Sequence, residues 1–461
     1  MDTAAIPHPP HRLPVLGDVV GMNPRTPVQS ALRLLRDLGP IAVRKAFGIE
    51  IVAVGGADLA AELSDDTRFA KHVGLPLRPL RSFVGDALFT AENDEPNWQL
   101  AHDILAPAFT REAMRGYHTI MLEVARELLA RWDVAADRGQ RVDVTADMTR
   151  LTLETIGRAG FGYRFGSFER DRPHPFVTAM TRALRYAPLS VVRPLAPLRR
   201  VMAGSARQHR ADVAMMERIV DEVIQARRDG AAPEAPDLLG LMLRTAHPQT
   251  GRRLDPVNIR QQVITFMIAG HETTSGALSF ALYYLTRDPQ ALARAQAEVD
   301  ALWGQVDDPE PTFTDIPKLR YVRAALDEAL RLWPTAPGYF RAARSETVLG
   351  GQYRMHQGDW VAVLLPLLHR DPHVWPDPDR FDPDRFAPGQ AKTRPPHAYK
   401  PFGTGQRACI GRQFALHEAV LALGLVLHRY ELSAPDGYRL RIAESLTLKP
   451  QGFELLPRRR R

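Results

Sequence analysis

The 461-residue sequence predicts a mainly α-helical fold with a minor β region, and three observations support this prediction. Most of the chain shows the apolar spacing of helices that bury one face. One segment, residues 255–285, is apolar on every side, as expected for a helix that runs through the centre of a large core. Short β-rich stretches occur at residues 41–54 and 347–365, far apart in the chain. We therefore expect a helical body with a small sheet built from distant segments.

The composition is that of a globular protein, with 45% hydrophobic and 25% charged residues and no low-complexity tract or repeat of fixed period. We expect a single domain over residues 1–461 that opens with a proline-rich lead-in at residues 1–27. No apolar run is long enough for a membrane span, and Met1 to Pro14 lack the apolar core of a signal peptide. The sequence thus predicts a cytoplasmic protein.

The formal net charge is +7, and the basic residues are scattered along the chain. Without a recognition-helix motif, or aromatic residues interleaved with the cations, this balance does not indicate nucleic-acid binding. The one basic run, residues 458–461, is expected to be a solvated tail. A positive surface also suits an acidic electron-donor protein.

The secondary structure can be predicted in chain order. Residues 28–38 predict a helix that ends at Gly39-Pro40, and residues 41–43 and 49–54 predict a hairpin with its turn near Phe47-Gly48. The stretches at 347–349 and 360–365 are expected to contribute to the same sheet. Further helices are expected from Asn97 and over residues 112–137, 143–160, 175–186 and 207–228, before a flexible loop at 230–236. Asp255 then caps the central helix, with Pro256 at its first position, and Arg287-Asp288-Pro289 stops it.

Cys409 is the only cysteine, so it can form neither an internal disulfide nor a site with several thiolates. Small residues surround it, and they allow a backbone loop to lie flat against a large planar ligand with N–H groups free to point at the sulfur: Gly403, Gly405, Ala408 and Gly411. Arg407 would suit a carboxylate on that ligand, and Phe402 would shield the sulfur from water. A buried cysteine that acts only as a small hydrophobe is the structural alternative.

The same loop also contains the spacing of a dinucleotide-binding fingerprint, in Gly403, Gly405 and Ala408. That fingerprint requires a preceding apolar strand, whereas residues 392–397 are polar and proline-rich and cannot form one. We therefore reject a Rossmann site here.

The central helix carries a polar cluster, Ala269 to Thr274, at its middle. A zinc-protease motif is excluded, because Ser275 stands where its second histidine would be. Gly270 permits a groove beside the helix, Thr273 can donate and accept a hydrogen bond, and Glu272 can relay protons from solvent. A local polar kink is the structural alternative.

Two further pairs have helical spacing. Trp98 and His102 share one face and each offers a ring N–H, although packing alone would explain them. Glu328 and Arg331 are spaced for an ion pair within a helix, and such pairs are usually exposed. Arg385 follows in an expected loop at residues 382–386.

Phe402 to Gly411 has the pattern F-x-x-G-x-R-x-C-x-G and resembles the haem-binding loop of the cytochrome P-450 monooxygenases. The resemblance covers nearly the whole chain and implies the fold of that family, a triangular prism of helices with a small mixed sheet. It implies haem b with Cys409 as axial iron ligand and dioxygen as co-substrate. It places the haem-binding, catalytic and structural residues as follows: Trp98, His102, Arg407, Phe402, Ala269 and Gly270 around the haem, Thr273 and Glu272 in proton delivery, and Glu328, Arg331 and Arg385 in a buried network.

Longer stretches, such as Asp147 to Leu153 and Arg331 to Pro337, are similar to the haem domain of bacterial self-sufficient fatty-acid hydroxylases. Those enzymes carry a fused flavin reductase that takes electrons from NADPH, and this chain ends where the linker would begin. The resemblance therefore implies NAD(P)H as electron source through a separate flavodoxin-type, FMN or ferredoxin-type donor protein. It also implies a hydrophobic substrate and an apolar pocket lined by Phe89, Leu77, Leu80, Val84, Ala269, Ala336 and Leu446.

One departure concerns the substrate. The fatty-acid hydroxylases hold the substrate carboxylate with an arginine and a tyrosine on the first hairpin, where this sequence has Ile49 and Ala53. Arg44, Lys45 or Arg78 are candidate replacements. The expected reaction is subterminal hydroxylation of medium- or long-chain fatty acids. The alternatives are a monooxygenase of neutral hydrophobic molecules, a haem peroxygenase, and a haem-based sensor or carrier.

Overall fold

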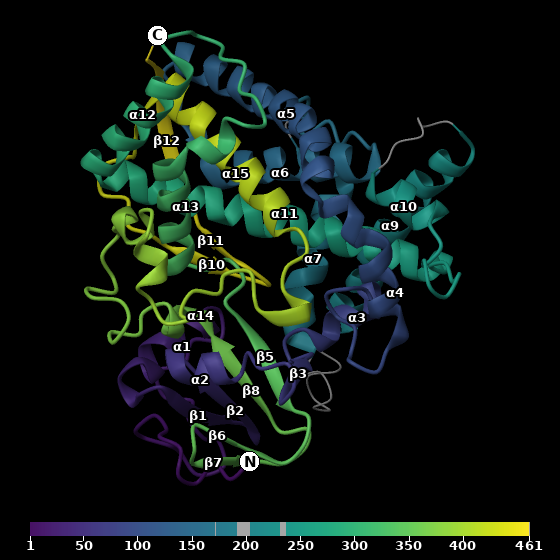
Figure 1. The fold of residues 1–461 in the computed structure, drawn as a ribbon, viewed down its shortest axis with the longest axis vertical. Helices are drawn as coiled ribbons and strands as arrows, with labels where there is room; N and C mark the ends of the chain where they lie inside the picture. Colours follow the sequence, from purple (N-terminus) through teal and green to yellow (C-terminus); the bar gives the residue numbers. More distant parts are fainter. Residues whose placement is uncertain (171, 191–202, 231–236, 461) are drawn as a thin grey trace.

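The computed structural model describes residues 1–170, 172–190, 203–230 and 237–460. Helices dominate it, as predicted, and they form the upper body of the molecule in Figure 1, above a smaller sheet region. The helices are α1 (Pro27–Leu35), α2 (Ala57–Glu62), α3 (Arg81–Val84), α4 (Pro96–Leu105), α5 (Arg111–Asp137), α6 (Val144–Phe161), α7 (Pro175–Ser190), α9 (Ala203–Arg228), α10 (Leu238–Arg244), α11 (Pro256–Arg287), α12 (Pro289–Trp303), α13 (Arg320–Leu332), α14 (Leu365–Leu368) and α15 (Arg412–Arg429). Within these described ranges no helix is long and apolar enough to cross a membrane.

The central helix is α11, which spans 32 residues and is buried on most sides. The Asp255 side chain caps it by accepting hydrogen bonds from the backbone N–H groups of Val257 and Asn258, each at 2.9 Å. Helices α6, α13, α15 and α9 pack against α11, so most of its length lies within the main apolar core. The prediction of a capped helix through the centre of the core is confirmed.

A five-stranded sheet has the order β1-β2-β8-β5-β3 and joins distant parts of the chain, as predicted. The hairpin of β1 and β2 turns at Phe47-Gly48, and β8 pairs in parallel with β2. The strands are β1 (Ile41–Ala46), β2 (Ile49–Val54), β3 (Phe69–His72), β4 (Val142–Asp143), β5 (Gly338–Ala343), β6 (Thr347–Leu349), β7 (Tyr353–Met355), β8 (Trp360–Leu364), β9 (Tyr430–Ser433), β10 (Ile442–Glu444), β11 (Leu448–Pro450) and β12 (Glu454–Arg459).

Three expectations need correction or fall outside the described part. Strand β6 does not join the main sheet but pairs with β7 in a separate hairpin, because only a short turn separates the two. Residues 383–386 form a turn of 3-10 helix rather than an open loop. The loop expected at 230–236 lies outside the described residues from position 231 onward.

The basic C-terminal run is exposed at Arg458 and Arg459, as predicted, but it is not a free tail. Arg458 and Arg459 belong to β12, which pairs with β9. Arg460 forms ion pairs with Asp300 at 2.7 Å and with Glu431 at 3.3 Å. The sequence-based prediction of a tail is wrong because a run of like charges says nothing about acidic partners that are distant in sequence. Arg461 lies outside the described residues.

The proline-rich lead-in is irregular, as expected, but it is held against the edge of β1. The backbone N–H of Val43 donates to the carbonyl of Pro7 at 2.8 Å, and that of Phe47 donates to the carbonyl of Leu16 at 3.1 Å. Asp18 is buried, accepts from the backbone N–H of Lys45 and pairs with Arg12, both at 2.8 Å. The lead-in therefore covers the outer edge of the sheet.

A buried carboxyl group, Glu418, lies on α15 within the helical core and is only 2% exposed. The hydroxyl of Thr155 on α6 is the polar group that favours the ionised form of this carboxyl group. That hydroxyl donates its own hydrogen bond to the carbonyl of Leu151 at 2.9 Å. Burial raises the pKa of Glu418 to about 8. The carboxyl group is therefore neutral at pH 7.

We expect Glu418→Gln to flatten the dependence of stability on pH. Between the ordinary pKa of a glutamate and about 8, the folded protein keeps a proton that the unfolded chain has lost, so stability falls as pH rises through this range. The loss is on the order of 3 kcal/mol from pH 5 to pH 8, and glutamine, which does not titrate, removes it. Thermal unfolding of the haem-loaded protein at both pH values measures the effect.

The matched control is Glu454→Gln, because among the described residues Glu454 forms an ion pair only with Arg141, at 3.9 Å. This variant should keep the slope of the unmodified protein. Equal slopes for Glu418→Gln and the unmodified protein would show that Glu418 is ionised in the core.

Candidate active site

The cysteine loop runs from Phe402 to Gly411 and leads directly into α15. The backbone N–H of Cys409 donates to the carbonyl of Phe402 at 2.8 Å, which closes the loop. The side chain of Cys409 is accessible although protein atoms surround it. Burial raises the pKa of its thiol, opposed by the backbone N–H of Gly411, which points at the sulfur, and by the charge of Arg412. The loop thus presents one sulfur, with a donor ready to stabilise its thiolate.

The middle of α11 is also accessible. Ala269 is exposed and Thr273 is half-buried, whereas the residues of the turns before and after them are almost all buried. The missing side chain of Gly270 faces α6, because a Cβ there would lie 3.1 Å from Cγ1 of Ile156. This glycine therefore allows close packing of α6 on α11, and Ala269 and Thr273 carry most of the accessible surface in the middle of α11.

Aromatic and basic side chains predicted to hold carboxylates come together beside the cysteine loop. The guanidinium of Arg407 lies 3.9 Å from the ring centre of Trp98, and the Trp98 and His102 rings stack with centres 4.9 Å apart. Arg407 also donates to the backbone carbonyls of Ala91 and Glu92, each at 3.2 Å. The structure therefore brings three predicted residues, from α4 and the cysteine loop, into one cluster.

Lys71 belongs to this cluster, and sequence analysis missed it. Its ammonium donates to the backbone carbonyl of Phe89, and burial together with the charge of Arg407 lowers its pKa to about 7. A buried amine next to a guanidinium is stabilised by an added anion. Lys71 lies on the short strand β3, which no sequence pattern predicted. The scarcity of lysine in the chain was the one feature of the sequence that could have drawn attention to it.

The acid and hydroxyl on α11 have separate partners. The Thr273 hydroxyl donates to the carbonyl of Ala269 at 2.8 Å. The Glu272 carboxylate accepts from the Thr447 hydroxyl at 2.9 Å and lies 3.1 Å from the ammonium of Lys449. Burial by itself would raise the pKa of Glu272, but Lys449, His271 and Thr447 outweigh it and hold the pKa well below its ordinary value. Glu272 is therefore an anion tied to β11, and Thr447 and Lys449 were not predicted.

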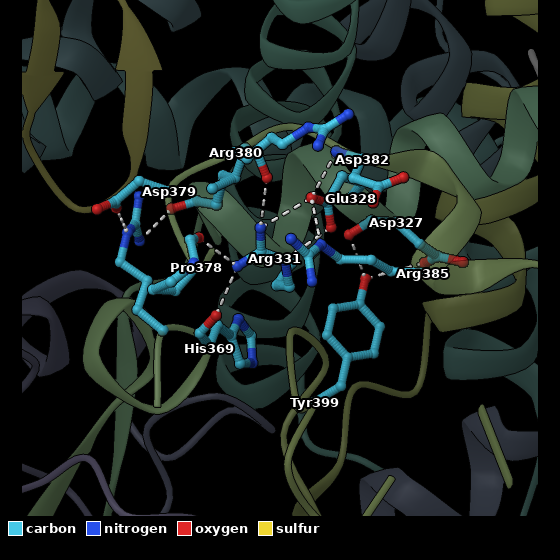
Figure 2. A network of polar contacts seen from close by, with 12 residues as sticks. Asp327, Glu328, Arg331, His369, Pro378, Asp379, Arg380, Asp382, Arg385 and Tyr399 are labelled. Atoms are coloured by element: carbon cyan, nitrogen blue, oxygen red, sulfur yellow. Dashed lines mark hydrogen bonds and ion pairs between the residues drawn. The ribbon is translucent and has the colours of Figure 1, made fainter. Parts of the chain in front are cut away.

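Figure 2 shows the buried network around α13. Arg331 donates to both oxygens of Glu328, at 2.7 and 2.8 Å, and neither side chain is exposed. Its remaining N–H groups donate to the backbone carbonyls of His369, Pro378 and Arg380. Arg385 lies 3.5 Å from Glu328, so the three predicted residues do meet.

The cysteine loop is attached to its surroundings from two directions. The backbone carbonyl of His369 accepts a hydrogen bond from Arg331. The ring of the same histidine accepts one from the backbone N–H of Lys400, just before the loop, at 2.9 Å. On the other side, Asp66 accepts the backbone N–H of Gln406 at 3.1 Å and is held by Arg341 at 2.7 Å. Gly405 makes that approach possible, because a Cβ there would stand 2.2 Å from the Asp66 carboxylate.

Comparison with known proteins now identifies the family. The model of the cytochrome P-450 family matches residues 7–457. A bifunctional cytochrome P-450/NADPH–P-450 reductase of Bacillus cereus is 45% identical over 99% of this chain, and a second one, of Bacillus subtilis, is 47% identical over 93%. The chain belongs to the cytochrome P-450 family. It spans only 42% and 40% of the length of these two relatives, that is, their P-450 part.

A fungal relative has the same relationship to the chain. A self-sufficient cytochrome P-450 monooxygenase of Phanerodontia chrysosporium is 40% identical over 99% of this chain, which covers 43% of that protein. Membership of the P-450 monooxygenases confirms the predicted fold class, since the observed helical body and small sheets are those of this family.

The residues present fit the haem that the family implies. In the described part of the chain, no three histidine, cysteine or acidic side chains gather as metal ligands, so Cys409 offers a single thiolate. One protein ligand suits an iron whose macrocycle supplies the other donors. The cluster of Arg407, Lys71, Trp98 and His102 is suited to the carboxylates of such a ligand.

The predicted P-450 substrate pocket residues lie in two groups. Leu80 and Val84 are buried and Leu77 is half-buried around α3, which packs against α11, and the nearby Phe89 is exposed. Ala336 and Leu446 belong to neighbouring segments, because the backbone N–H of Leu448 donates to the carbonyl of Thr335 at 2.9 Å. Gly276 brings α11 against both segments, since a Cβ there would lie 2.8 Å from each. Both groups thus border α11.

Proposed function

We propose that this P-450 chain is a haem-thiolate monooxygenase that inserts one oxygen atom of O2 into C–H bonds of a hydrophobic substrate. The observation that carries the proposal is the lone Cys409, in a closed loop with the Gly411 N–H at its sulfur and a carboxylate-binding cluster beside it. When bound, the haem would supply binding and reductive cleavage of dioxygen, which electron donation by the Cys409 thiolate would favour. The protein supplies the ligand, the position and the protons.

Proton delivery is assigned to Thr273, with Glu272 and Lys449 behind it. The Thr273 hydroxyl donates its hydrogen bond to the Ala269 carbonyl. Its oxygen is therefore free to accept a hydrogen bond from a proton donor. Glu272 is an anion and cannot itself be the first source of a proton. Lys449 contacts it at 3.1 Å with a side chain that is 13% exposed. Lys449 therefore keeps Glu272 ionised, so that the carboxylate can accept a hydrogen bond from a proton donor on the solvent side.

We expect Thr273→Ala to uncouple electron use from product formation. Removing the hydroxyl interrupts proton delivery, so reducing equivalents should leave as hydrogen peroxide, and the ratio of product to NADPH consumed should fall about tenfold or more. Thr273→Ser, which keeps the hydroxyl, is the matched control. Tight coupling in the alanine variant would contradict a role for Thr273 in proton delivery.

We further infer that the substrate is a medium- or long-chain fatty acid, hydroxylated at a subterminal carbon, and that Arg44 holds its carboxylate. Arg44 shares a face of the β1–β2 hairpin with Ile49 and Ala53, the positions expected to carry an anchor. It is half-buried, burial lowers its pKa, and it forms no hydrogen bond or ion pair with the residues that the structure describes. The other candidates are engaged: Lys45 pairs with Glu50 at 2.9 Å, and Arg78 donates to the Val73 carbonyl at 3.2 Å.

Titration of the ferric, haem-loaded protein tests this assignment. A long-chain fatty acid should shift the Soret band at about tenfold lower concentration than the alcohol of equal length, because a charge-assisted hydrogen bond contributes about 1.5 kcal/mol or more. Arg44→Gln should abolish this preference, and Lys45→Gln should keep it. Equal binding of acid and alcohol would instead assign a neutral hydrophobic substrate, and no spectral response to either would refute the proposed substrate class.

Electrons are proposed to come from NADPH through a reductase. The relatives named above combine a P-450 with an NADPH–P-450 reductase, and this chain corresponds to their P-450 part. A flavodoxin-like or FMN-containing donor, with a ferredoxin-type protein as alternative, would serve this role. Reduction of the ferric protein by a purified donor of each kind under carbon monoxide distinguishes them.

A further inference from the structure

Large apolar side chains are exposed in one place far more than elsewhere. Among the described residues, eleven large apolar side chains are exposed, and six of them lie in two short segments. The six are Leu13, Val15, Leu16 and Val20 in the lead-in, and Phe47 and Ile49 at the turn of the β1–β2 hairpin. The other five are scattered over the molecule. We call these six residues the lead-in patch.

The two segments of the lead-in patch are joined through their backbones. Gly17 forms an isolated bridge with Ala46, and the backbone N–H of Phe47 donates to the carbonyl of Leu16 at 3.1 Å. A Cβ on Gly17 would lie 2.2 Å from the carbonyl oxygen of Lys45, so glycine permits this close approach. The patch is thus one surface, at the N-terminal end of the molecule in Figure 1, opposite the C-terminus.

The most exposed members stand at the tips of turns. Val15 is 94% exposed and Phe47 is 68% exposed, and both have positive φ angles, of 68° and 51°. This backbone conformation is unfavourable for a β-branched or aromatic residue, and a glycine or asparagine would be more stable there. Apolar side chains at such tips contribute nothing to the core, so they are better explained by a contact outside the protein.

The charged side chains of the lead-in and the hairpin carry a slight positive excess. Asp18 is paired with Arg12 and Glu50 with Lys45, while Asp2 forms no ion pair with the described residues. The guanidinium groups of Arg25 and Arg44 form no ion pair or hydrogen bond with other described residues. A surface that combines protruding apolar tips with uncompensated cations is complementary to anionic headgroups above an apolar layer.

We propose that the lead-in patch docks this protein on the surface of an anionic lipid bilayer. Convex turn tips suit a deformable bilayer, whereas a protein partner would need matching cavities. Docking would be peripheral, through side chains that reach the boundary between headgroups and acyl chains, because no helix in the described ranges is able to span. The surface would also place the hairpin that carries Arg44 beside the layer in which hydrophobic substrates accumulate, a consequence that rests on the proposed function.

Co-sedimentation with vesicles tests the docking without any turnover. The haem-loaded protein is mixed with vesicles of phosphatidylglycerol and phosphatidylcholine in equal parts, and with vesicles of phosphatidylcholine alone. We expect binding to the first, little binding to the second, and weakening by salt. The double variant Val15→Asp/Phe47→Asp should bind at least about tenfold more weakly, because burial of two such side chains contributes more than 1.4 kcal/mol.

The matched control is Val134→Asp/Val257→Asp, which removes two apolar side chains that are 49% and 54% exposed at other places and adds the same charge. This variant should bind almost as well as the unmodified protein. Equal loss in both double variants, or no binding of the unmodified protein to anionic vesicles, would overturn the proposal. A dimer that only the patch variant dissociates, without vesicle binding, would overturn it too and assign the patch to contacts between copies.

Discussion

We expect Cys409→Ser, which removes the proposed haem ligand, to abolish the thiolate signature in the spectrum of the reduced carbon-monoxide complex and to lower monooxygenase activity at least about a thousandfold. Serine keeps the size of the side chain but is a far weaker donor to iron, so the electron donation that favours O–O cleavage is lost. The chain has no second cysteine that could replace the ligand. The absorption spectrum of the reduced protein under carbon monoxide is the direct measurement.

Ala408→Ser is the matched control, because it adds a hydroxyl group to the neighbouring residue of the same loop without changing the sulfur. It should retain the thiolate signature. A signature that persists in Cys409→Ser would refute the assignment of Cys409 as ligand, whatever the effect on activity.

We expect Glu328→Gln to destabilise the folded protein by about 3–5 kcal/mol. The substitution leaves the buried charge of Arg331 without its partner, since both side chains are completely enclosed. The backbone N–H of Asp382, which donates to Glu328 at 2.9 Å, also loses an ionised acceptor. Urea-induced unfolding, followed in parallel by the Soret band and by circular dichroism, measures the change.

An exposed ion pair provides the comparison. Asp384 pairs with Arg294 at 2.8 Å, and both side chains are more than half exposed. Asp384→Asn should therefore cost less than about 1 kcal/mol. Similar losses for the two variants would show that the Glu328–Arg331 pair has no special stabilising role.

The sequence predicted those features that are encoded by nearby residues. The cap at Asp255, the apolar length of α11, and the turn at Phe47-Gly48 are local signals, and all three agree with the structure. The spacing of Glu328 and Arg331 predicted a pair, but the pattern alone favoured an exposed one. Its burial depends on carbonyl groups some 40 to 50 residues further along the chain, at His369, Pro378 and Arg380.

Features that depend on tertiary contacts were missed. Lys71 comes close to Arg407 only because β3 joins the sheet. Strand β3 has only four residues, too few to show a recognisable strand pattern in the sequence. Lys449 meets Glu272 because β11 lies against α11. The C-terminal arginines were misjudged for the same reason, since Asp300 is distant in sequence from Arg460.

The attachment of the cysteine loop by Asp66 has a consequence for the order of assembly. Arg341 of β5 donates to the Asp66 carboxylate, which also accepts the backbone N–H of Gln406, three residues before Cys409. The loop therefore reaches its final shape only after segments 340 residues apart in the sequence have met, which is a slow, non-local event in folding. On a growing chain, the sulfur would be correctly placed only after Gln406 had left the ribosome.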